Sequence, residues 1–348
     1  MESIDLRSDT VTQPTVEMRK AMSEAECGDD VWDEDITVKR LESLAAEMTG
    51  KDAAIFTASG TMSNLIAVLT WCDRGTEIIV GDQSHIFWNE VGGASALGGV
   101  SVRTVPNNLR GGMDPLDVEE AIRRENIHFP ATSMIGLENT HNRCSGGVLT
   151  IEETESIAKI GRLKGIPSHL DGARIFNASV ALSVQVKALC SPVDSVSFCL
   201  SKGLSAPIGS LLCGSRDFVD KAKKWRKMVG GGMRQVGVIA SAGLVALNTM
   251  VERLAEDHSN ATLLAQGLSG ISGINLNQDL IESNIVIFEW VSGPAVDLIE
   301  SLSRKGLKAS YVGGQKIRMV THAGISHRDI YRAINIVGET ATKPITSD

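Results

Sequence analysis

The sequence has few aromatic residues and few prolines. It contains 7 Phe, 5 Trp, 2 Tyr and 9 Pro in 348 residues, although hydrophobic residues make up 43% of the chain. A packed interior must therefore be built mainly from Leu, Ile, Val, Met and Ala, and a largely disordered chain is excluded. At roughly 100–200 residues per domain, the length predicts two domains, or one large domain with an appendage.

The sequence also lacks an excess of positive charge. Lys and Arg number 34 against 42 Asp and Glu, so the formal net charge is −8. Proteins that bind nucleic acid or anionic membrane surfaces carry a basic footprint, so we expect neither partner. No run of about 18 apolar residues occurs, so no membrane span is expected. A local anion site stays compatible with this charge, because helix N-termini bind phosphate unaided.

Cysteine pairs of the C-x-x-C type are absent. The six cysteines are scattered along the chain, which argues against a zinc ribbon or a thioredoxin-type site, and no metal site is expected. In a chain of this length they are typical of reduced thiols in a cytosolic protein. The N-terminus shows no basic stretch followed by an apolar one, so no signal peptide is evident. We therefore expect a cytoplasmic location.

Between about residues 55 and 250, short apolar runs alternate with longer segments of helical pattern. This alternation predicts an α/β domain with a largely parallel sheet. In such sheets ligands bind beyond the C-terminal ends of the strands, so polar residues that directly follow apolar runs are candidates for chemistry. The predicted strands are Ala53–Phe56, Glu77–Val80, Val100–Val105, Ser133–Leu137, Gly165–Leu170, Ser195–Leu200 and Ser210–Cys213. The predicted helices are Thr61–Trp71, Glu90–Ala96, Asp114–Arg124, Ile151–Lys164 and Arg216–Met228.

After about residue 255 the pattern changes to that of a smaller α+β unit. We predict a large α/β domain over 31–250 and a small C-terminal α+β domain over 251–348. The segment 1–30 is expected to pack on the large domain or on a partner subunit. The predicted elements of the small domain are Ala261–Leu268, Asn284–Trp290, Ala295–Lys305, Lys316–Val320 and Arg328–Thr340.

Several common catalytic signatures are missing, including G-x-S-x-G, Walker A, H-E-x-x-H and a G-x-G-x-x-G after a strand. One candidate site is the turn Ser59, Gly60 and Thr61, which joins a predicted strand to a predicted helix. Such a turn offers free backbone N–H groups and the positive end of the helix dipole to a phosphate. The alternative is that Ser59 or Thr61 merely caps the helix.

Two further candidates lie at strand ends. Asp171 closes one apolar run, and a buried carboxylate is costly unless it is paired. The alternative is that Asp171 simply pairs with the nearby Arg174. Lys202 follows another apolar run, where burial would make its amine a nucleophile for Schiff-base chemistry. The alternative is a lysine whose stem packs while its head reaches solvent.

The three features together favour a pyridoxal-phosphate enzyme. Such an enzyme needs a lysine for the cofactor aldehyde, a carboxylate for the pyridinium nitrogen and a helix N-terminus for the phosphate. Lys202, Asp171 and the turn at Gly60 supply one candidate for each role. The carboxylate would keep the ring nitrogen protonated, and the protonated ring accepts electrons from a substrate carbanion.

Beyond these features, the sequence resembles the low-specificity L-threonine aldolases. That family has fold type I, the aspartate-aminotransferase-like fold, with a large, mainly parallel cofactor domain and a smaller C-terminal domain. The resembling segments run in family order over nearly the whole chain. They are residues 5–13, 28–36, 57–65, 85–94, 138–143, 169–179, 198–211, 230–236 and 317–323.

The resemblance implies a role for each matching residue. Lys202 would hold the cofactor aldehyde and Asp171 its ring nitrogen. His85 would stack on the cofactor ring, and His141 would lie with it near the substrate β-hydroxyl. The other implied roles are cofactor binding by Ser59, Gly60, Thr61 and Arg174, α-carboxylate binding by Ser8, Arg174 and Arg318, and a phosphate or subunit contact by Arg234.

The resemblance also implies the reaction, which is retro-aldol cleavage of threonine, allo-threonine or a related β-hydroxy-α-amino acid to glycine and an aldehyde. A histidine would take the β-hydroxyl proton, directly or through water. One departure is Trp32, where the family usually has Tyr. If this segment contributes to the site, the bulkier ring would reshape the pocket near the β-carbon.

Two alternatives stay open at this point. The same scaffold carries certain alanine racemases, and a racemase would use the same lysine, aspartate and phosphate turn. A non-catalytic protein on a decayed enzyme fold is the other, although the intact Asp171 and Lys202 argue against it. The family resemblance further implies a homotetramer, built from dimers, with sites at the subunit interface.

Overall fold

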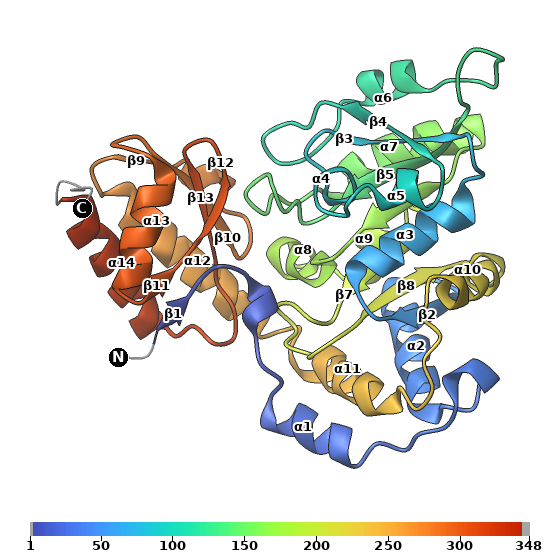
Figure 1. The fold of residues 1–348 in the computed structure, drawn as a ribbon, viewed down its shortest axis with the longest axis horizontal. Coiled ribbons are helices and arrows are strands. Elements are labelled where there is room, and N and C mark those ends of the chain that lie inside the picture. The colour runs from blue at the N-terminus through green and yellow to red at the C-terminus, as the bar shows by residue number, and fades with distance from the viewer. Residues whose placement is uncertain (1–2, 343–348) are drawn as a thin grey trace.

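The computed structural model describes residues 3–342, and its large unit is built around one seven-stranded sheet (Figure 1). The strands are β2 (Ala53–Thr57), β3 (Glu77–Gly81), β4 (Ser101–Val105), β5 (Thr132–Glu138), β6 (Ser168–Asp171), β7 (Ser195–Cys199) and β8 (Ser210–Gly214). Their order is β2-β8-β7-β6-β5-β3-β4, and only β8 runs antiparallel to its neighbours. The expectation of a largely parallel sheet is confirmed.

Helices pack around this sheet. They are α1 (Val16–Ser23), α2 (Ile36–Thr49), α3 (Gly60–Trp71), α4 (His85–Trp88), α5 (Gly93–Ala96), α6 (Pro115–Ala121), α7 (Ile151–Lys164), α8 (Ile175–Leu182), α9 (Val186–Cys190), α10 (Arg216–Met228) and α11 (Gly237–Thr249). Local sequence explains their limits. In α7, Thr150 and Glu153 form a reciprocal capping box, and Gly165 ends the helix in the left-handed conformation.

Two sequence expectations in the large unit are wrong in detail. The predicted helix Glu90–Ala96 is replaced by the short helices α4 and α5, because Val91 and Gly92 between them have φ values of 55° and 64°. The left-handed region is incompatible with a continuous helix. The strand predicted to begin at Gly165 begins at Ser168 instead, since Gly165 is the C-cap of α7.

The C-terminal unit contains a four-stranded antiparallel sheet covered by three helices. Its strands are β9 (Ile274–Asn275), β10 (Ile285–Trp290), β12 (Ser310–Gly313) and β13 (Lys316–Val320), in the order β12-β13-β10-β9. Its helices are α12 (Leu254–Ser269), α13 (Ala295–Arg304) and α14 (His327–Ala341), and a short 3-10 helix covers Gln278–Leu280. The helix predicted over Ala261–Leu268 is therefore twice as long.

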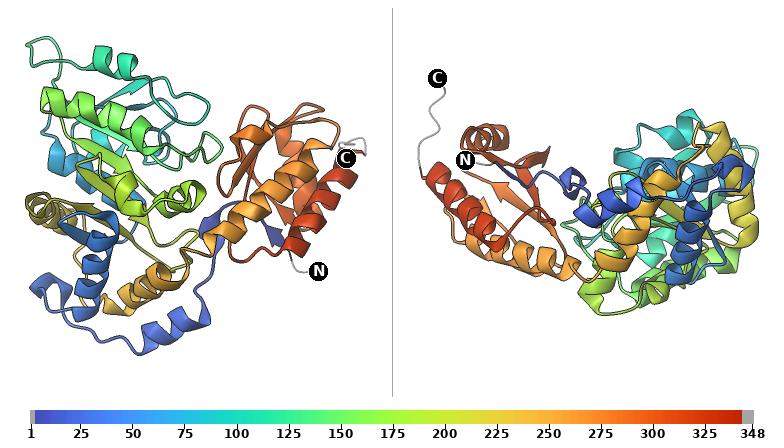
Figure 2. Two further views of the ribbon diagram at one scale, coloured as in Figure 1. Left: turned by 180° about the vertical axis from the view of Figure 1, so that it is seen from behind. Right: turned by 90° about the horizontal axis from the view of Figure 1, so that it is seen from below.

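The N-terminal segment joins both units. Its first strand, β1 (Ile4–Asp5), pairs in parallel with β11 (Leu307–Lys308) of the C-terminal unit. Its helix α1 packs on α11 of the large unit, so the segment crosses between the two (Figure 2). The division into 1–30, 31–250 and 251–348 stays a prediction, and residues 1–2 and 343–348 of it lie outside the described range.

Each unit has its own apolar core. The largest cluster joins the strands of the seven-stranded sheet to α2, α7, α8 and α11, and a second lies between α12, α13, α14 and the small sheet. Within residues 3–342, no helix is long and apolar enough to cross a membrane alone, although the bent pair α11 and α12 passes a test of length and composition.

Candidate active site

The carboxyl ends of β6 and β7 bring the two predicted key residues to one edge of the sheet. Asp171 is the last residue of β6, and Lys202 follows the adjacent parallel strand β7. Asp171 is 3% exposed, and Lys202 is half-buried. Burial alone would raise the pKa of Asp171, but the charges of His85 and Lys202 and a hydrogen bond from Asn64 outweigh it and lower the pKa. The carboxylate is therefore ionised at neutral pH.

Asn64 on α3 holds Asp171 in place. Its Nδ2 donates to Asp171 Oδ2 at 2.8 Å and to Glu90 Oε1 at 2.7 Å. Its Oδ1 accepts from Ser197 Oγ at 2.8 Å and lies 3.1 Å from His169 Nε2. All of these side chains are buried. A fully bonded network of this kind fixes the direction in which the carboxylate points.

His85 lies at the start of α4, beside the same network. Its Nδ1 lies 2.9 Å from Glu90 Oε1, and its backbone N–H donates to Glu138 Oε2 at 2.6 Å. Burial lowers the pKa of His85, but the hydrogen bond to Glu90 and the charges of Asp171 and Glu138 raise it above 6.5 overall. His85 Nδ1 is thus occupied, which leaves Nε2 as its free nitrogen.

His85, Glu90 and Asp171 also place ligand atoms within 4.8 Å of one another. The structure accounts for this closeness without a metal ion, because Asn64 and His85 supply the hydrogen bonds that the two carboxylates need. His85, Glu90 and Asp171, linked through Asn64, therefore form a hydrogen-bonded group that holds the site in place from the protein interior.

The turn Ser59, Gly60 and Thr61 opens α3 at the end of β2. Ser59 Oγ accepts from the Met62 backbone N–H at 3.2 Å, so the capping expectation is met. A Cβ on Gly60 would lie 2.9 Å from Cys199 Sγ at the end of β7, so only glycine fits between the helix and the strand. The other N–H groups of the first turn stay available to an anion, as at other helix N-termini. Capping and anion binding are therefore compatible here.

His141 is buried after β5 and contrasts with His85. It is 1% exposed, and neither of its ring nitrogens has a hydrogen-bond partner within residues 3–342. The nearest carboxylate oxygen is Glu138 Oε2, 3.9 Å from Nε2. Gly111 has φ +94°, and a Cβ there would come within 2.4 Å of the His141 side chain, so this loop lies flat against it.

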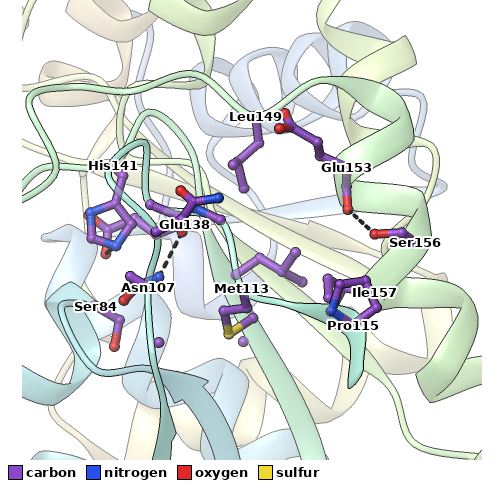
Figure 3. A pocket seen from close by; sticks show the side chains of 16 residues that line it. Ser84, Asn107, Met113, Pro115, Glu138, His141, Leu149, Glu153, Ser156 and Ile157 are labelled. Carbon is purple, nitrogen blue, oxygen red and sulfur yellow. Dashed lines mark hydrogen bonds and ion pairs between the residues drawn. The ribbon is translucent and has the colours of Figure 1, made fainter. Parts of the chain in front are cut away.

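A cavity of about 120 Å³ adjoins His141. In Figure 3, His141, Glu138, Asn107 and Ser84 gather at one end of it, and apolar side chains such as Ile157 lie at the other. Ser84 Oγ is also buried without a partner among the described residues. The polar end of the cavity is roomy enough for ordered water, which such buried groups require.

Arg174 is bound by a carboxylate that the sequence argument overlooked. Its Nε and Nη2 both donate to Asp9 at 2.7 Å, and both side chains are buried. Burial would raise the pKa of Asp9, but the charges of Arg174 and Lys202 lower it well below its usual range. Ser8 Oγ lies 3.4 Å from Asp9 Oδ1. The alternative in which Arg174 simply pairs with Asp171 is therefore wrong, because Arg174 pairs with Asp9 instead.

Arg318 on β13 approaches the same place from the C-terminal unit. Its Nη1 donates to Asn142 Oδ1 at 2.8 Å, and Arg174 Nη1 reaches the same oxygen at 3.3 Å. Arg318 has no carboxylate partner among the described residues, and its Nε is unpartnered. Burial, followed by the charge of Arg174, lowers the pKa of Arg318 to about 10. The pair of arginines therefore carries one more positive charge than Asp9 neutralises.

Trp32 and Arg234 lie together. Trp32 ends the 3-10 helix Asp30–Trp32 and is 72% exposed. The Asp30 backbone N–H donates to the Arg234 carbonyl at 3.1 Å, and Arg234 Nη1 lies 3.0 Å from Asp29 Oδ2. No hydrogen bond or ion pair joins either side chain to Lys202 or Asp171 within residues 3–342.

Several residues that support the site were not predicted from the sequence, although they lie within the resembling segments. Glu138 directly follows the predicted strand Ser133–Leu137, so the rule applied to Asp171 and Lys202 could have found it. The others do not directly follow a predicted strand, and pattern alone could not single them out. These residues are Asp9, Asn64, Glu90, Glu138 and Asn142.

The chain resembles known proteins over most of its length. The family model of the beta-eliminating lyases matches residues 5–290. The chain is 46% identical over 341 residues to low-specificity L-threonine aldolase 1 of Arabidopsis thaliana, covering 96% of this chain and 95% of that relative. It is 42% identical over 330 residues to the low specificity L-threonine aldolase of Escherichia coli (strain K12), covering 94% and 96%.

A solved structure of Leishmania major threonine aldolase superposes with a TM-score of 0.84 at 19% identity, covering 97% of this chain and 100% of that chain. That likeness shows a shared fold. The family match over residues 5–290 and the identity to the two relatives show, beyond a shared fold, the family to which the chain belongs. The chain therefore belongs to the beta-eliminating lyase family, and within it to the low-specificity L-threonine aldolases.

Proposed function

We propose that the chain cleaves L-threonine, L-allo-threonine or a related β-hydroxy-α-amino acid to glycine and an aldehyde. Membership of the family makes it a carbon–carbon lyase. The observation that carries the assignment is the juxtaposition of Asp171 and Lys202 at adjacent strand ends, with Asn64 fixing the carboxylate. This is the arrangement that electron withdrawal from an amino-acid substrate requires.

The residues present fit pyridoxal 5'-phosphate. Asp171 is an ionised, buried carboxylate that suits a pyridinium nitrogen, and Lys202 is a half-buried amine without an ion-pair partner among residues 3–342. Gly60 and Thr61 offer the first-turn N–H groups of α3 to the phosphate. When bound, the cofactor supplies an electron sink for the bond that breaks.

Arg318 is the best-placed residue to bind the substrate α-carboxylate. It is half-buried and lacks a carboxylate of its own, whereas Arg174 already has Asp9. An arginine binds a carboxylate through a planar pair of hydrogen bonds, so it orients as well as attracts. We propose that Arg318, with support from Asn142 and Arg174, turns the substrate so that its Cα–Cβ bond faces the electron sink.

The histidines supply the proton transfer. When the Cα–Cβ bond breaks, the β-hydroxyl must lose its proton, and a group with a pKa near the working pH does this best. Among residues 3–342, His85 Nε2 and both ring nitrogens of His141 have no hydrogen-bond partner. Glu138 positions His85, because it accepts from the His85 backbone N–H, and its Oε2 lies 3.9 Å from His141 Nε2.

Product analysis tests the proposed reaction. Purified chain supplied with pyridoxal phosphate should absorb visible light, and borohydride should abolish that band. Threonine should give glycine and acetaldehyde, and Lys202→Ala should give neither product nor band. Formation of D-alanine from L-alanine without glycine from threonine would establish the racemase alternative. A chain that gains no absorbance would support the non-catalytic one.

We further propose a homotetramer in which a partner contributes to each site. Support comes from exposed large side chains, which include Trp88 at 52% and Val91 at 96% exposure around α4, and Trp32 in the segment that contacts Arg234. Arg234 is the proposed phosphate contact across the interface. Co-expression of Lys202→Ala with Arg234→Ala should restore a measurable part of the activity that each variant lacks alone. A monomer by light scattering, or no restoration, contradicts this proposal.

A cytoplasmic location is also a proposal. It is supported by the six cysteines, all of which are free thiols and four of which are buried. Fractionation of cells that express a tagged chain checks it, and recovery from the secreted fraction would contradict it.

A further inference from the structure

A pocket of about 240 Å³ lies between the two units, next to Arg318. Residues of β12 and β13 line one side of it, and residues around α4 and after β5 line the other. Arg143 and Lys316 join Arg318 in its wall, together with the neutral side chains of Gln83 and Asn142. The pocket therefore extends the proposed substrate site outward.

The three cations of this pocket are unpaired. Arg143, Lys316 and Arg318 make no ion pair within 4 Å of any carboxylate in residues 3–342. Lys316 and Arg318 are two residues apart on β13, so their side chains emerge on the same face of the sheet. In a chain of net charge −8, three uncompensated positive groups around one pocket leave a strong local preference for anions.

The carboxylates in the neighbourhood hydrogen-bond to neutral groups and make no ion pair with these three cations among the described residues. Asp82 accepts from the Asn107 backbone N–H at 3.0 Å. Glu138 accepts from two backbone N–H groups, at His85 and Asn142. Glu289, which is opposite Lys316 on β10, lies 3.1 Å from Asn275 Nδ2.

Arg143 is also held in a fixed orientation. Its guanidinium carbon lies 4.4 Å from the centre of the Trp88 ring, and its Nε donates to Gln83 Oε1 at 3.3 Å. Trp88 in turn donates from Nε1 to the Asp82 carbonyl at 2.6 Å. Stacking on an aromatic ring fixes the plane of a guanidinium and leaves its outer N–H groups free. A planar, pre-oriented donor set of this kind suits a second carboxylate.

We propose that the chain accepts and prefers β-hydroxy-α-amino acids whose β substituent ends in a carboxylate, with Arg143 and Lys316 binding that second carboxylate. The inference rests on the proposed aldolase function and names its substrate class. Arg318 would hold the α-carboxylate, and the second carboxylate would extend into the pocket. The pocket has room for a substrate of four or five carbons.

The reaction balances for β-hydroxyaspartate. The β-hydroxyl loses its proton, and the Cα–Cβ bond breaks with its electron pair left on Cα. The β-carbon becomes the aldehyde of glyoxylate, and Cα takes a proton to give glycine. No oxidant, reductant or further co-reactant is needed.

The decisive experiment compares β-hydroxyaspartate with β-hydroxyasparagine, which has the same shape and no second charge, and includes threonine and β-hydroxyglutamate. We expect kcat/KM to favour the acid over the amide by roughly tenfold at low salt. Added salt should reduce this preference, because the pocket is open to solvent and its charges are screened. In Arg143→Gln the preference should be lost, and Arg143→Lys should restore part of it.

Lys159→Gln is the matched control, because Lys159 is exposed on α7 and does not line the pocket, and the change removes the same charge. It should keep the preference. Lys316→Gln should reduce it less than Arg143→Gln does, since Lys316 is exposed. If Arg143→Gln does not fold, Arg143→Lys and Lys316→Gln still decide the question.

Thermal unfolding of the holoenzyme gives a readout without turnover. Succinate should raise Tm more than butyrate does at equal ionic strength, and Arg143→Gln should remove the difference. An enzyme that cleaves threonine but shows no preference for the acid, or one whose preference survives Arg143→Gln, overturns the inference alone. If threonine is not cleaved at all, the proposed function fails, and an absent succinate effect then overturns this inference separately.

Discussion

Arg174 and Arg318 donate to the same oxygen of Asn142, yet their surroundings differ. Arg174 is buried against Asp9 through two hydrogen bonds of 2.7 Å, whereas Arg318 has no carboxylate among residues 3–342 and its pKa is lowered to about 10. The two histidines differ in the same way, because the ring of His85 bonds to Glu90, whereas the ring of His141 has no hydrogen-bond partner in the part of the chain that the structure describes. In each pair, one member is bound to a carboxylate and the other has more unused bonding capacity. The unused capacity indicates where substrate belongs.

The largest effect is expected from removing the partner of Arg174. Asp9→Asn leaves a buried cation without its anion and should lower the free energy of unfolding by about 3 to 5 kcal/mol. Because the pKa of Asp9 is lowered on folding, its contribution is present above the unfolded pKa and is lost only as pH falls toward the folded pKa. Denaturant unfolding at neutral and at acidic pH measures both effects, and the two proteins should converge at low pH.

Asp5→Asn is the control for that experiment. Asp5 pairs with Arg7 at 2.5 Å near the surface, where an ion pair contributes about 1 kcal/mol or less. Equal losses of unfolding free energy in Asp9→Asn and Asp5→Asn would show that the buried Asp9–Arg174 pair stabilises the fold no more than the surface pair does.

Arg318→Gln should affect activity more than stability, whereas Asp9→Asn mainly lowers stability. It removes the proposed α-carboxylate contact, so kcat/KM for threonine should fall by roughly 100-fold, or about 3 kcal/mol. Stability should stay the same or rise, because an unpaired and partly buried charge is removed. Steady-state kinetics and thermal unfolding measure the two quantities. A variant that is unstable but fully active would place Arg318 in the framework with Arg174.

Glu90→Gln should remove the carboxylate that bonds to the ring of His85, so that His85, like His141, has no carboxylate hydrogen bond to its ring. The hydrogen bond and charge of Glu90 raise the pKa of His85 against the effect of burial, so without them the pKa should fall. If neutral His85 accepts the proton, the acidic limb of the kcat/KM profile should move to lower pH. Glu155→Gln on the surface of α7 is the control and should leave the profile in place. A limb that stays fixed in both variants assigns proton transfer to another group.

The smallest effect concerns the free capacity of Arg318 itself. Acetate at ten times its Kd should stabilise the wild type by about 1.4 kcal/mol, seen as a rise in Tm of roughly one or two degrees. Chloride at the same ionic strength should not do so. Arg318→Gln should abolish the acetate effect, whereas Arg174 is already satisfied and contributes nothing to it. An effect that persists in Arg318→Gln would move the carboxylate site elsewhere.

The site residues that sequence pattern could identify are those that lie at the ends of predicted strands, where the alternation of strands and helices places them. Asp171, Lys202 and the turn at Gly60 each sit at the end of an apolar run, and the order of strands brings them together. Asp9 could not be found in this way, because its partner Arg174 is far along the chain and no local period links the two. Asn64 is equally hidden, since it is a polar residue inside an apolar helix whose value depends on what lies across the sheet.

The pairing of β1 with β11 has a consequence for how the chain is made. Ile4 is synthesised well before its partner Leu307, because about 300 residues separate the two along the chain. Asp9 lies a few residues after Ile4, and it likewise cannot form its ion pair until Arg174 has been synthesised. Contacts between such distant segments form slowly, because a long loop must close first. The strands of the seven-stranded sheet can thus pair during synthesis. The active site is completed only later, when the C-terminal unit has been synthesised and β11 has paired with β1.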